Sequence, residues 1–226
     1  FLHRVKMSIK IRPEIKLLKN EIISTRRDFH KYPELGFQEH RSGKIIAEKL
    51  TKLGLTVQTG IGKTGVVGIL NPNHKGKTIA LRADMDALPI QETGDSQYIS
   101  QNNGVMHACG HDGHMAMLLG AAQVLSKYSK DINGTVKFIF QPAEEGFGGA
   151  KYMIEDGVLE GVDEIYGSHL WNYQEYGTIG VKKGPVMAAA DLFTITIKGI
   201  GGHGATPHGT VDSILISSHV VQALQS

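Results

Sequence analysis

The feature that most constrains the fold is the alternation of helical and strand-like apolar patterns along most of the chain. Apolar residues recur at helical spacing from Pro13 to about Tyr32, and again from Ser42 to Leu53, where Gly54 provides a stop. Further helices are expected at 115–125 and 150–156, and strands at Val57, 66–70, 78–81, 135–140 and 164–167. This alternation predicts an α/β sheet with helices on both faces.

Two of these strands are separated by a short segment that favours a turn. Residues 71–76 (NPNHKG) contain the proline and glycine that set turn dihedrals. We therefore expect 66–70 and 78–81 to pair as a hairpin.

A change of pattern near residue 183 indicates a second unit. Residues 191–198 (DLFTITIK) alternate at period two, which is typical of a half-exposed strand, and a glycine-rich stretch and a helix from about Asp212 follow. We expect two domains, a first at 1–182 and a second, α+β, at 183–226.

Composition excludes several classes of protein. The 226 residues carry a formal charge of +2 with both signs interspersed, which argues against a nucleic-acid partner. No apolar run is long enough to span a membrane, and 1–12 lacks the apolar core of a signal peptide, so no membrane association is expected. A single cysteine, Cys109, fits a reducing compartment, and a cytoplasmic location is the expectation.

Three segments carry residues suited to metal chemistry. Cys109 and His111 lie in 107–114 (HACGHDGH), directly before an apolar helix, and thiolates and imidazoles are good ligands for transition metals. Glu144 and Glu145 follow a buried strand, and His169 follows another. Ligands in open α/β sheets bind beyond the carboxyl ends of the strands, so these segments are expected to converge at one edge.

The two adjacent glutamates favour a division of labour. Neighbouring carboxylates raise each other's pKa and leave the backbone in different directions, so one can hold metal while the other accepts a proton from water. Asp84 and Asp86, in 82–89 (RADMDALP), can orient a ligand histidine or the base. His203 lies in the glycine-rich segment 201–208 (GGHGATPH), which suits contact with a substrate oxygen.

Six ordered motifs together resemble the aminoacylase and carboxypeptidase-like amidohydrolases, in the branch of hippurate hydrolases, N-acyl-amino-acid amidohydrolases and auxin-conjugate hydrolases. Besides HACGHDGH and GGHGATPH, they are FHKYPELGFQE at 29–39, RADMDALPIQE at 82–92, FQPAEEG at 140–146 and GSHLW at 167–171. The resemblance implies a zinc-peptidase-like mixed sheet and the start of a ferredoxin-like lid domain that dimerises. It also implies a small N-acyl amino acid as substrate and a homodimer formed through the lid.

The same resemblance implies a role for each site residue. It implies Cys109, His111, Glu145 and His169 as ligands of two divalent ions, which in the family are commonly manganese, zinc, cobalt or nickel. It makes Glu144 the general base and His203 the residue that polarises the scissile carbonyl, in related dimers across the subunit interface. Asp86 joins the catalytic set as a carboxylate that supports the ligands. Members of the family supply one more histidine ligand from a C-terminal half to which no residue here corresponds.

Other interpretations remain open from the sequence. The chain could be a catalytically incompetent remnant of such an enzyme, a related dipeptidase or carboxypeptidase, or a one-metal enzyme. Taken singly, Cys109 is more often a buried apolar residue, and His169 and His203 are more often satisfied or exposed histidines. Asp84 could simply pair with Arg82, while His107 and His114 could hold the loop and His208 could bind a substrate carboxylate.

Overall fold

A computed structural model describes residues 11–225, which form two compact units at 11–178 and 179–225. The boundary expected from the sequence near residue 183 stays a prediction. The assignment of the units as catalytic and lid domains stays a prediction.

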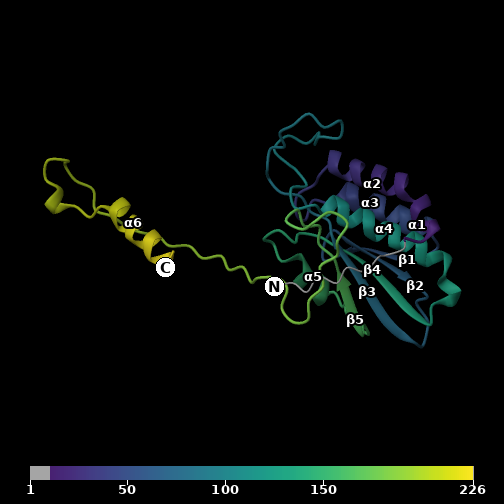
Figure 1. Cartoon of the computed structure of the whole chain (residues 1–226). Coiled ribbons are helices and arrows are strands. Elements are labelled where there is room, and N and C mark those ends of the chain that lie inside the picture. Colours follow the sequence, from purple (N-terminus) through teal and green to yellow (C-terminus); the bar gives the residue numbers. More distant parts are fainter. Residues whose placement is uncertain (1–10, 226) are drawn as a thin grey trace. The chain divides into compact units, whose positions relative to one another are not determined.

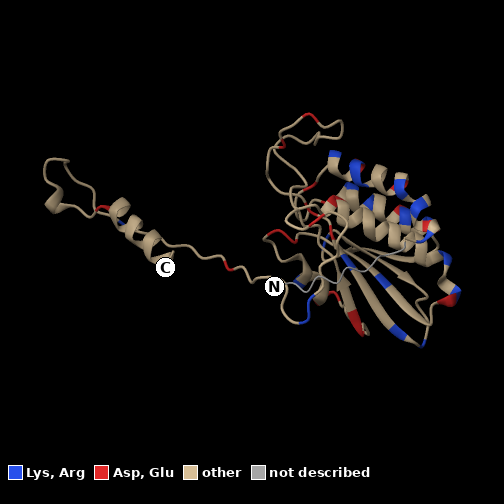
Figure 2. Cartoon of the chain, viewed as in Figure 1, with Lys and Arg blue, Asp and Glu red and all other residues tan. Residues whose placement is uncertain are grey.

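The first unit opens with three helices (Figure 1). The helix expected from Pro13 to Tyr32 is divided at Leu18 into α1 (Pro13–Leu17) and α2 (Lys19–Lys31), and Tyr32 caps the second. The third, α3 (His40–Lys52), ends two residues before Gly54, as predicted. Figure 2 shows Lys and Arg residues along the helices α2 and α3, and acidic residues in several of the loops.

A five-stranded mixed sheet forms the centre of this unit. Its strands are β1 (Thr56–Ile61), β2 (Gly65–Leu70), β3 (Lys77–Asp84), β4 (Gly134–Gln141) and β5 (Glu164–Gly167), in the order β1-β2-β4-β3-β5. Strands β3, β4 and β5 are parallel, and β2 is antiparallel to both β1 and β4.

The predicted hairpin of β2 and β3 is wrong. β4 lies between these two strands, and β2 instead forms a hairpin with β1 through the turn at 62–64. The turn at 71–76 carries the chain past the position that β4 occupies. The reason is that β4, buried along nearly its whole length, gains a neighbour on each side when it enters the middle of the sheet.

Helices cover both faces of the sheet, as predicted, but unequally (Figure 1). On one face α2, α3 and α4 (His111–Lys127) enclose the larger core, whose fully buried members include Phe29, Ile46, Leu50, Met115 and Phe138. On the other face α5 (Gly149–Glu155) contributes Met153 to a smaller cluster with Val67, Ala80 and Ile139. A short 3-10 helix, η1 (Ser129–Asp131), joins α4 to β4.

The parallel strands end at a common edge. Asp84 of β3 lies opposite Gln141 of β4, and Arg82 lies opposite Gly167 of β5, so the loops after all three strands leave from the same side. The first turn of α4 starts beside them, because His111 and His114 contact the Asp84 side chain of β3. The sequence analysis predicted that the candidate metal ligands converge at this edge.

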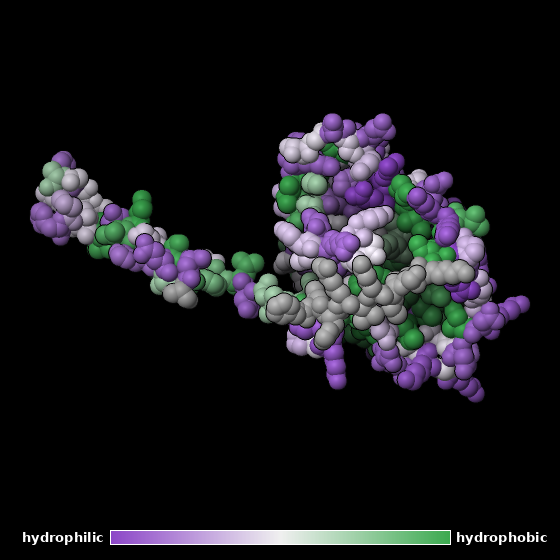
Figure 3. Space-filling model, in the orientation of Figure 1, coloured by the Kyte–Doolittle hydropathy of each residue, from purple (hydrophilic) through white to green (hydrophobic). Residues whose placement is uncertain are grey.

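The second unit contains η2 (Pro207–Gly209) and α6 (Ser213–Leu224). Asp212 caps α6 by accepting hydrogen bonds from the N–H groups of Ile214 and Leu215, which confirms the predicted helix start. The strand predicted at 191–198 is wrong for this structure: the segment has no partner strand among residues 11–225, and a strand requires one. Apolar residues, Leu192 and Phe193 among them, are exposed along this unit (Figure 3).

Within the part of the chain that the structure describes, no helix combines the length and apolar character needed to cross a membrane.

Candidate metal centre

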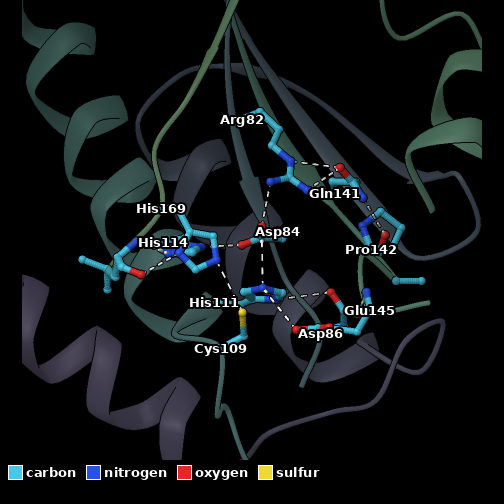
Figure 4. Close-up of polar contacts among 12 residues, drawn as sticks. Arg82, Asp84, Asp86, Cys109, His111, His114, Gln141, Pro142, Glu145 and His169 are labelled. Atoms are coloured by element: carbon cyan, nitrogen blue, oxygen red, sulfur yellow. Dashed lines mark hydrogen bonds and ion pairs between the residues drawn. The ribbon is translucent and has the colours of Figure 1, made fainter. Parts of the chain in front are cut away.

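Side chains from four segments converge at the carboxyl edge of the sheet (Figure 4). The segments are the end of β3 with the residues after it, the start of α4, the loop after β4 and the residues after β5. They supply Asp84, Asp86, Cys109, His111, His114, Glu144, Glu145 and His169.

Three of the four predicted metal ligands lie around the fourth, His111. The ligand atoms of Cys109, His111 and His169 all lie within 4.8 Å of one another, and those of His111, Glu144 and Glu145 form a second such group. Cys109 Sγ is 3.4 Å from His169 Nε2, and His111 Nε2 is 3.9 Å from Glu145 Oε1. The fold therefore brings the predicted ligand residues close to one another.

His111 has the surroundings expected of a ligand. Its ring is 1% exposed, yet neither ring nitrogen makes a well-formed hydrogen bond. Nδ1 lies 3.3 Å from Asp86 Oδ1, and Nε2 faces Asp84 Oδ2 at 3.7 Å. Buried polar atoms are almost always satisfied, and a cation bound at Nε2 would satisfy this one while Asp86 holds the opposite nitrogen. The donor set of thiol, imidazoles and carboxylates fits a divalent transition metal.

The site divides into two parts by exposure. We call Asp84, Asp86, His111 and His114 the floor, because all four are at most 2% exposed. We call Cys109, Glu144, Glu145 and His169 the rim, because all four are partly or fully exposed and lie on loops. The floor is carried by β3 and α4 or by residues directly adjoining them.

Charge in the floor is fixed by local contacts. Burial alone would raise the pKa of Asp84, but the hydrogen bond from His114 and the charge of Arg82 hold it well below its usual range. The pKa of Asp86 is also lowered, because the neighbouring His111 and the Glu145 N–H outweigh the effect of burial. Both aspartates are therefore anions near neutral pH.

The pKa values of two rim groups are raised instead of lowered. Burial, together with the adjacent Glu145, raises the pKa of Cys109 to about 12, so the group is a thiol until a cation replaces its proton. Partial burial and the negative charge of Glu145 raise the pKa of Glu144. Glu144 thus holds a proton more readily than an ordinary glutamate, as a general base must.

The loop that carries both glutamates is held by a residue that sequence reasoning did not identify. Glu39, fully buried, accepts a hydrogen bond from the N–H of Ala143 at 2.8 Å and another from the hydroxyl of Thr64. Ala143 adopts a left-handed backbone (φ 49°), and Gly149 approaches so closely that a Cβ there would lie 1.8 Å from the Pro142 carbonyl oxygen. Glu39 ends the motif FHKYPELGFQE, so the signal was present without an assigned role.

A second network that the sequence did not reveal anchors the start of α4. His30 of α2 contacts Asp112 at 2.8 Å through Nδ1 and Glu92 at 3.0 Å through Nε2. Arg26 forms an ion pair with the same oxygen of Asp112 at 2.6 Å. Asp112 adjoins His111, so these contacts fix the helix end that presents a floor residue.

The remaining predicted residues have varied surroundings. His107 is buried, and neither of its ring nitrogens has a hydrogen-bond partner, whereas both nitrogens of His114 do. His203 and His208 lie in the second unit, where His203 Nδ1 accepts a hydrogen bond from the N–H of Ala205 at 3.1 Å. The catalytic role of His203 stays a prediction.

Comparison with known proteins now identifies the family. The model of peptidase family M20/M25/M40 matches residues 80–225. The chain belongs to this family. The amidohydrolase resemblance carried by the six motifs is thereby confirmed, as is the α/β fold with its mixed sheet.

Relatives in the family include hydrolases named for different activities. The chain is 49% identical over 218 residues to thermostable carboxypeptidase 2 of Saccharolobus solfataricus, covering 95% of this chain and 56% of that protein. It is also 49% identical over 217 residues to an N-acyl-L-amino acid amidohydrolase of Geobacillus stearothermophilus, with 94% and 59% covered. The chain thus spans little more than half the length of these relatives.

A solved structure of the M20 family has the same fold. A dinuclear metal-binding peptidase from Bacillus subtilis superposes with a TM-score of 0.71 at 44% identity, covering 75% of this chain and 48% of that one. This neighbour and the donor groups around His111 agree in indicating a metal-binding site.

Proposed function

We propose that this M20 chain carries the site of a metal-dependent amidohydrolase that cleaves the amide bond of N-acyl amino acids. The observation that supports it most is that His111 belongs to two groups of candidate ligands, one with Cys109 and His169 and one with Glu144 and Glu145, whose ligand atoms lie within 4.8 Å of one another in each group. The Geobacillus relative, named for this activity, is 49% identical over most of the chain.

Each residue of the site has a role in this proposal. Two divalent ions, held by the four ligands, would polarise the scissile carbonyl and lower the pKa of water. Glu144 accepts the proton of the attacking water and delivers it to the leaving amine. Asp86 orients His111 through Nδ1 and accepts the N–H of Glu145 at 2.9 Å, so it supports one ligand from each side of the site.

His203 would stabilise the oxyanion that forms during attack on the amide. The support is its place in GGHGATPH within the second unit, together with the family pattern in which this histidine reaches the site of a partner subunit. The proposal therefore includes a homodimer formed through the domain that begins near residue 183. Light scattering of the chain tests it, and a strictly monomeric protein would contradict it.

The identity of the metal follows from ligand type. One thiol and two imidazoles favour zinc, cobalt or nickel, and the carboxylates also suit manganese. Metal analysis of the loaded protein is expected to give two equivalents per chain. A single equivalent would favour a one-metal enzyme.

The cellular setting of the proposal is the cytoplasm. The support is a lone cysteine whose proposed role requires a reduced thiol. The near-neutral formal charge of +2 supports a small-molecule substrate and no nucleic-acid partner.

The decisive experiment is a substrate screen on the 226-residue chain, stripped of metal with a chelator and reloaded with Mn²⁺ or Co²⁺. Hippurate, acetylated amino acids and longer acyl derivatives are compared with dipeptides. Glu144→Gln is expected to lower kcat by roughly 10²- to 10⁴-fold while the metal content stays unchanged. Glu155→Gln, on the exposed surface of α5, is the matched control.

Each outcome has a defined meaning. Full activity in Glu144→Gln would overturn the mechanism. Cleavage of dipeptides alone would favour a peptidase, in keeping with the carboxypeptidase name of the Saccharolobus relative. Metal binding without turnover of any substrate would contradict the enzymatic proposal for this chain and support a catalytically incompetent remnant.

A further inference from the structure

His114 lies one helical turn after His111 and is almost as deeply buried, but both of its ring nitrogens have hydrogen-bond partners. Nδ1 contacts Asp84 Oδ1 at 2.6 Å, and Nε2 accepts the backbone N–H of Leu170 at 2.9 Å (Figure 4). Because that N–H can only donate, Nε2 carries the lone pair and Nδ1 carries the proton. The two contacts therefore fix one neutral tautomer.

This assignment decides between two uses of the ring. Asp84, His111 and His114 have ligand atoms within 4.8 Å of one another and could by distance form a metal site. However, the proton on Nδ1 points at Asp84, and the lone pair on Nε2 is occupied by Leu170. His114 thus has no free donor atom to offer a cation.

The backbone that His114 holds belongs to the rim. Leu170 directly follows His169, in a segment beyond β5 that has no regular secondary structure. The Leu170 side chain lies against the start of α4, where a Cβ on Gly113 would be 2.4 Å from Leu170 Cδ1 and one on Gly110 would be 3.6 Å from Leu170 Cβ. Both contacts hold the segment where His169 Nε2 reaches Cys109 Sγ.

A chain of hydrogen bonds links Asp84, the partner of His114, to the rim loop that follows β4. Asp84 Oδ2 accepts from Arg82 Nη1 at 2.6 Å, and Gln141 Oε1 accepts from Arg82 Nε at 2.9 Å and Nη2 at 2.6 Å. Gln141 is the last residue of β4 and precedes the loop that carries Glu144 and Glu145. The segments bearing the rim carboxylates and His169 are therefore joined beneath the site.

We propose that His114, oriented by Asp84, is a positioning residue that sets the place of His169 through the Leu170 N–H. The inference rests on the proposed metal site and adds the requirement that this one hydrogen bond controls how well His169 binds the metal. Partners that orient a ligand typically contribute 10- to 100-fold to metal affinity.

The test is a double-mutant cycle read out as Co²⁺ affinity of the chelator-stripped 226-residue chain, measured by competition titration. His114→Ala is expected to weaken Co²⁺ binding by about 10- to 100-fold. The loss should disappear when His169→Ala is already present, and should persist when Glu145→Ala is present, because the Leu170 N–H directly adjoins His169 and not Glu145.

Two further variants separate positioning from packing. In His114→Gln the side-chain oxygen reaches the place of Nε2 and can accept the Leu170 N–H, so its affinity should recover toward wild type. His107→Ala removes an equally buried histidine that has no hydrogen bond to any segment of the site, so it should leave Co²⁺ affinity unchanged even where it lowers the melting temperature.

The outcomes also separate this inference from the proposed function. A wild-type chain that binds no Co²⁺ would overturn the metal site itself. If wild type binds Co²⁺ but the loss in His114→Ala is the same with and without His169, the positioning role is wrong, because that additivity is the behaviour of a separate ligand or of a general effect on the fold.

Discussion

The floor and the rim of the site differ in how their positions are determined. Floor residues lie on or beside β3 and α4, are at most 2% exposed and contact one another through ion pairs and hydrogen bonds. Rim residues lie on loops and have few contacts with the protein, such as the 3.4 Å approach of Cys109 to His169. The floor residues are therefore held by the protein's own contacts, whereas in the proposed site the rim residues would gain their main partner when a cation binds.

The largest expected effect separates the two ligand histidines. Among residues 11–225, His111 belongs to each of the three groups of side chains close enough to share an ion, whereas His169 belongs to one. We expect His111→Ala to weaken Zn²⁺ or Co²⁺ binding by more than about 100-fold, beyond the range for orienting partners. His169→Ala should cost clearly less. Competition titration measures both, and equal losses would break the distinction between floor and rim.

Asp86 should give the next largest effect. It faces His111 Nδ1 at 3.3 Å and accepts the N–H of Glu145, so it serves a ligand in each part of the site. Asp86→Ala is expected to lower metal affinity about 10- to 100-fold with both ligands still present. Isothermal titration measures the change, and an affinity within the error of wild type would show that the ligands need no such support.

Glu39, which holds the loop of Glu144 and Glu145, should contribute to the free energy of unfolding. Removing its carboxylate in Glu39→Ala leaves the N–H of Ala143 and the hydroxyl of Thr64 buried without an acceptor. The free energy of unfolding should fall by about 1 to 3 kcal/mol. Glu39→Gln keeps an acceptor for Ala143 and should lose less. Urea denaturation compares the variants, and an equal loss in both would mean that the negative charge, not the hydrogen bond, matters.

The smallest expected effect is a pH dependence at the base of α4. The hydrogen bond to Asp112, with that to Glu92, raises the pKa of His30 despite its burial. A pKa raised on folding stabilises the protein below the unfolded value near 6.5, and the contribution is lost as pH rises through the folded value. Unfolding free energy should therefore decline from about pH 6 to pH 8 more steeply in wild type than in His30→Gln, as urea denaturation at several pH values would measure. Parallel curves would contradict a charged His30.

Much of the fold could be predicted because the local patterns agree with the elements formed. The helices predicted from Pro13, Ser42 and Asp212 and the strand predicted at 164–167 are all present, although the first helix is divided at Leu18 and the second begins at His40. The pairing of β2 could not be predicted, because strand order depends on which strand gains most from burial on both edges, and a turn sequence does not report this. The segment 191–198 has strand periodicity but no neighbour to pair with.

The site could be predicted where chemistry is visible in residue type. Cysteine, histidine and paired glutamates indicate a candidate metal centre, and their convergence follows from the parallel strands. Glu39, His30 and the contact of His114 with Leu170 could not be predicted, because each joins residues distant in sequence: Glu39 and Ala143 are 104 positions apart. Such contacts exist only once the fold brings the segments together.

The strand order has a consequence for how the protein folds. β4 must enter between β2 and β3, and its end is locked to β3 by the contact of Arg82 with Gln141, 59 positions away. Pairings of this kind close long loops, and the entropic cost of closure precedes the stabilisation gained, so we expect them to form late. The loops that carry the carboxylates and His169 follow β4 and β5, so we expect the proposed metal site to be completed only after the sheet has formed. The time course of metal binding during refolding would then report when the last step of folding occurs.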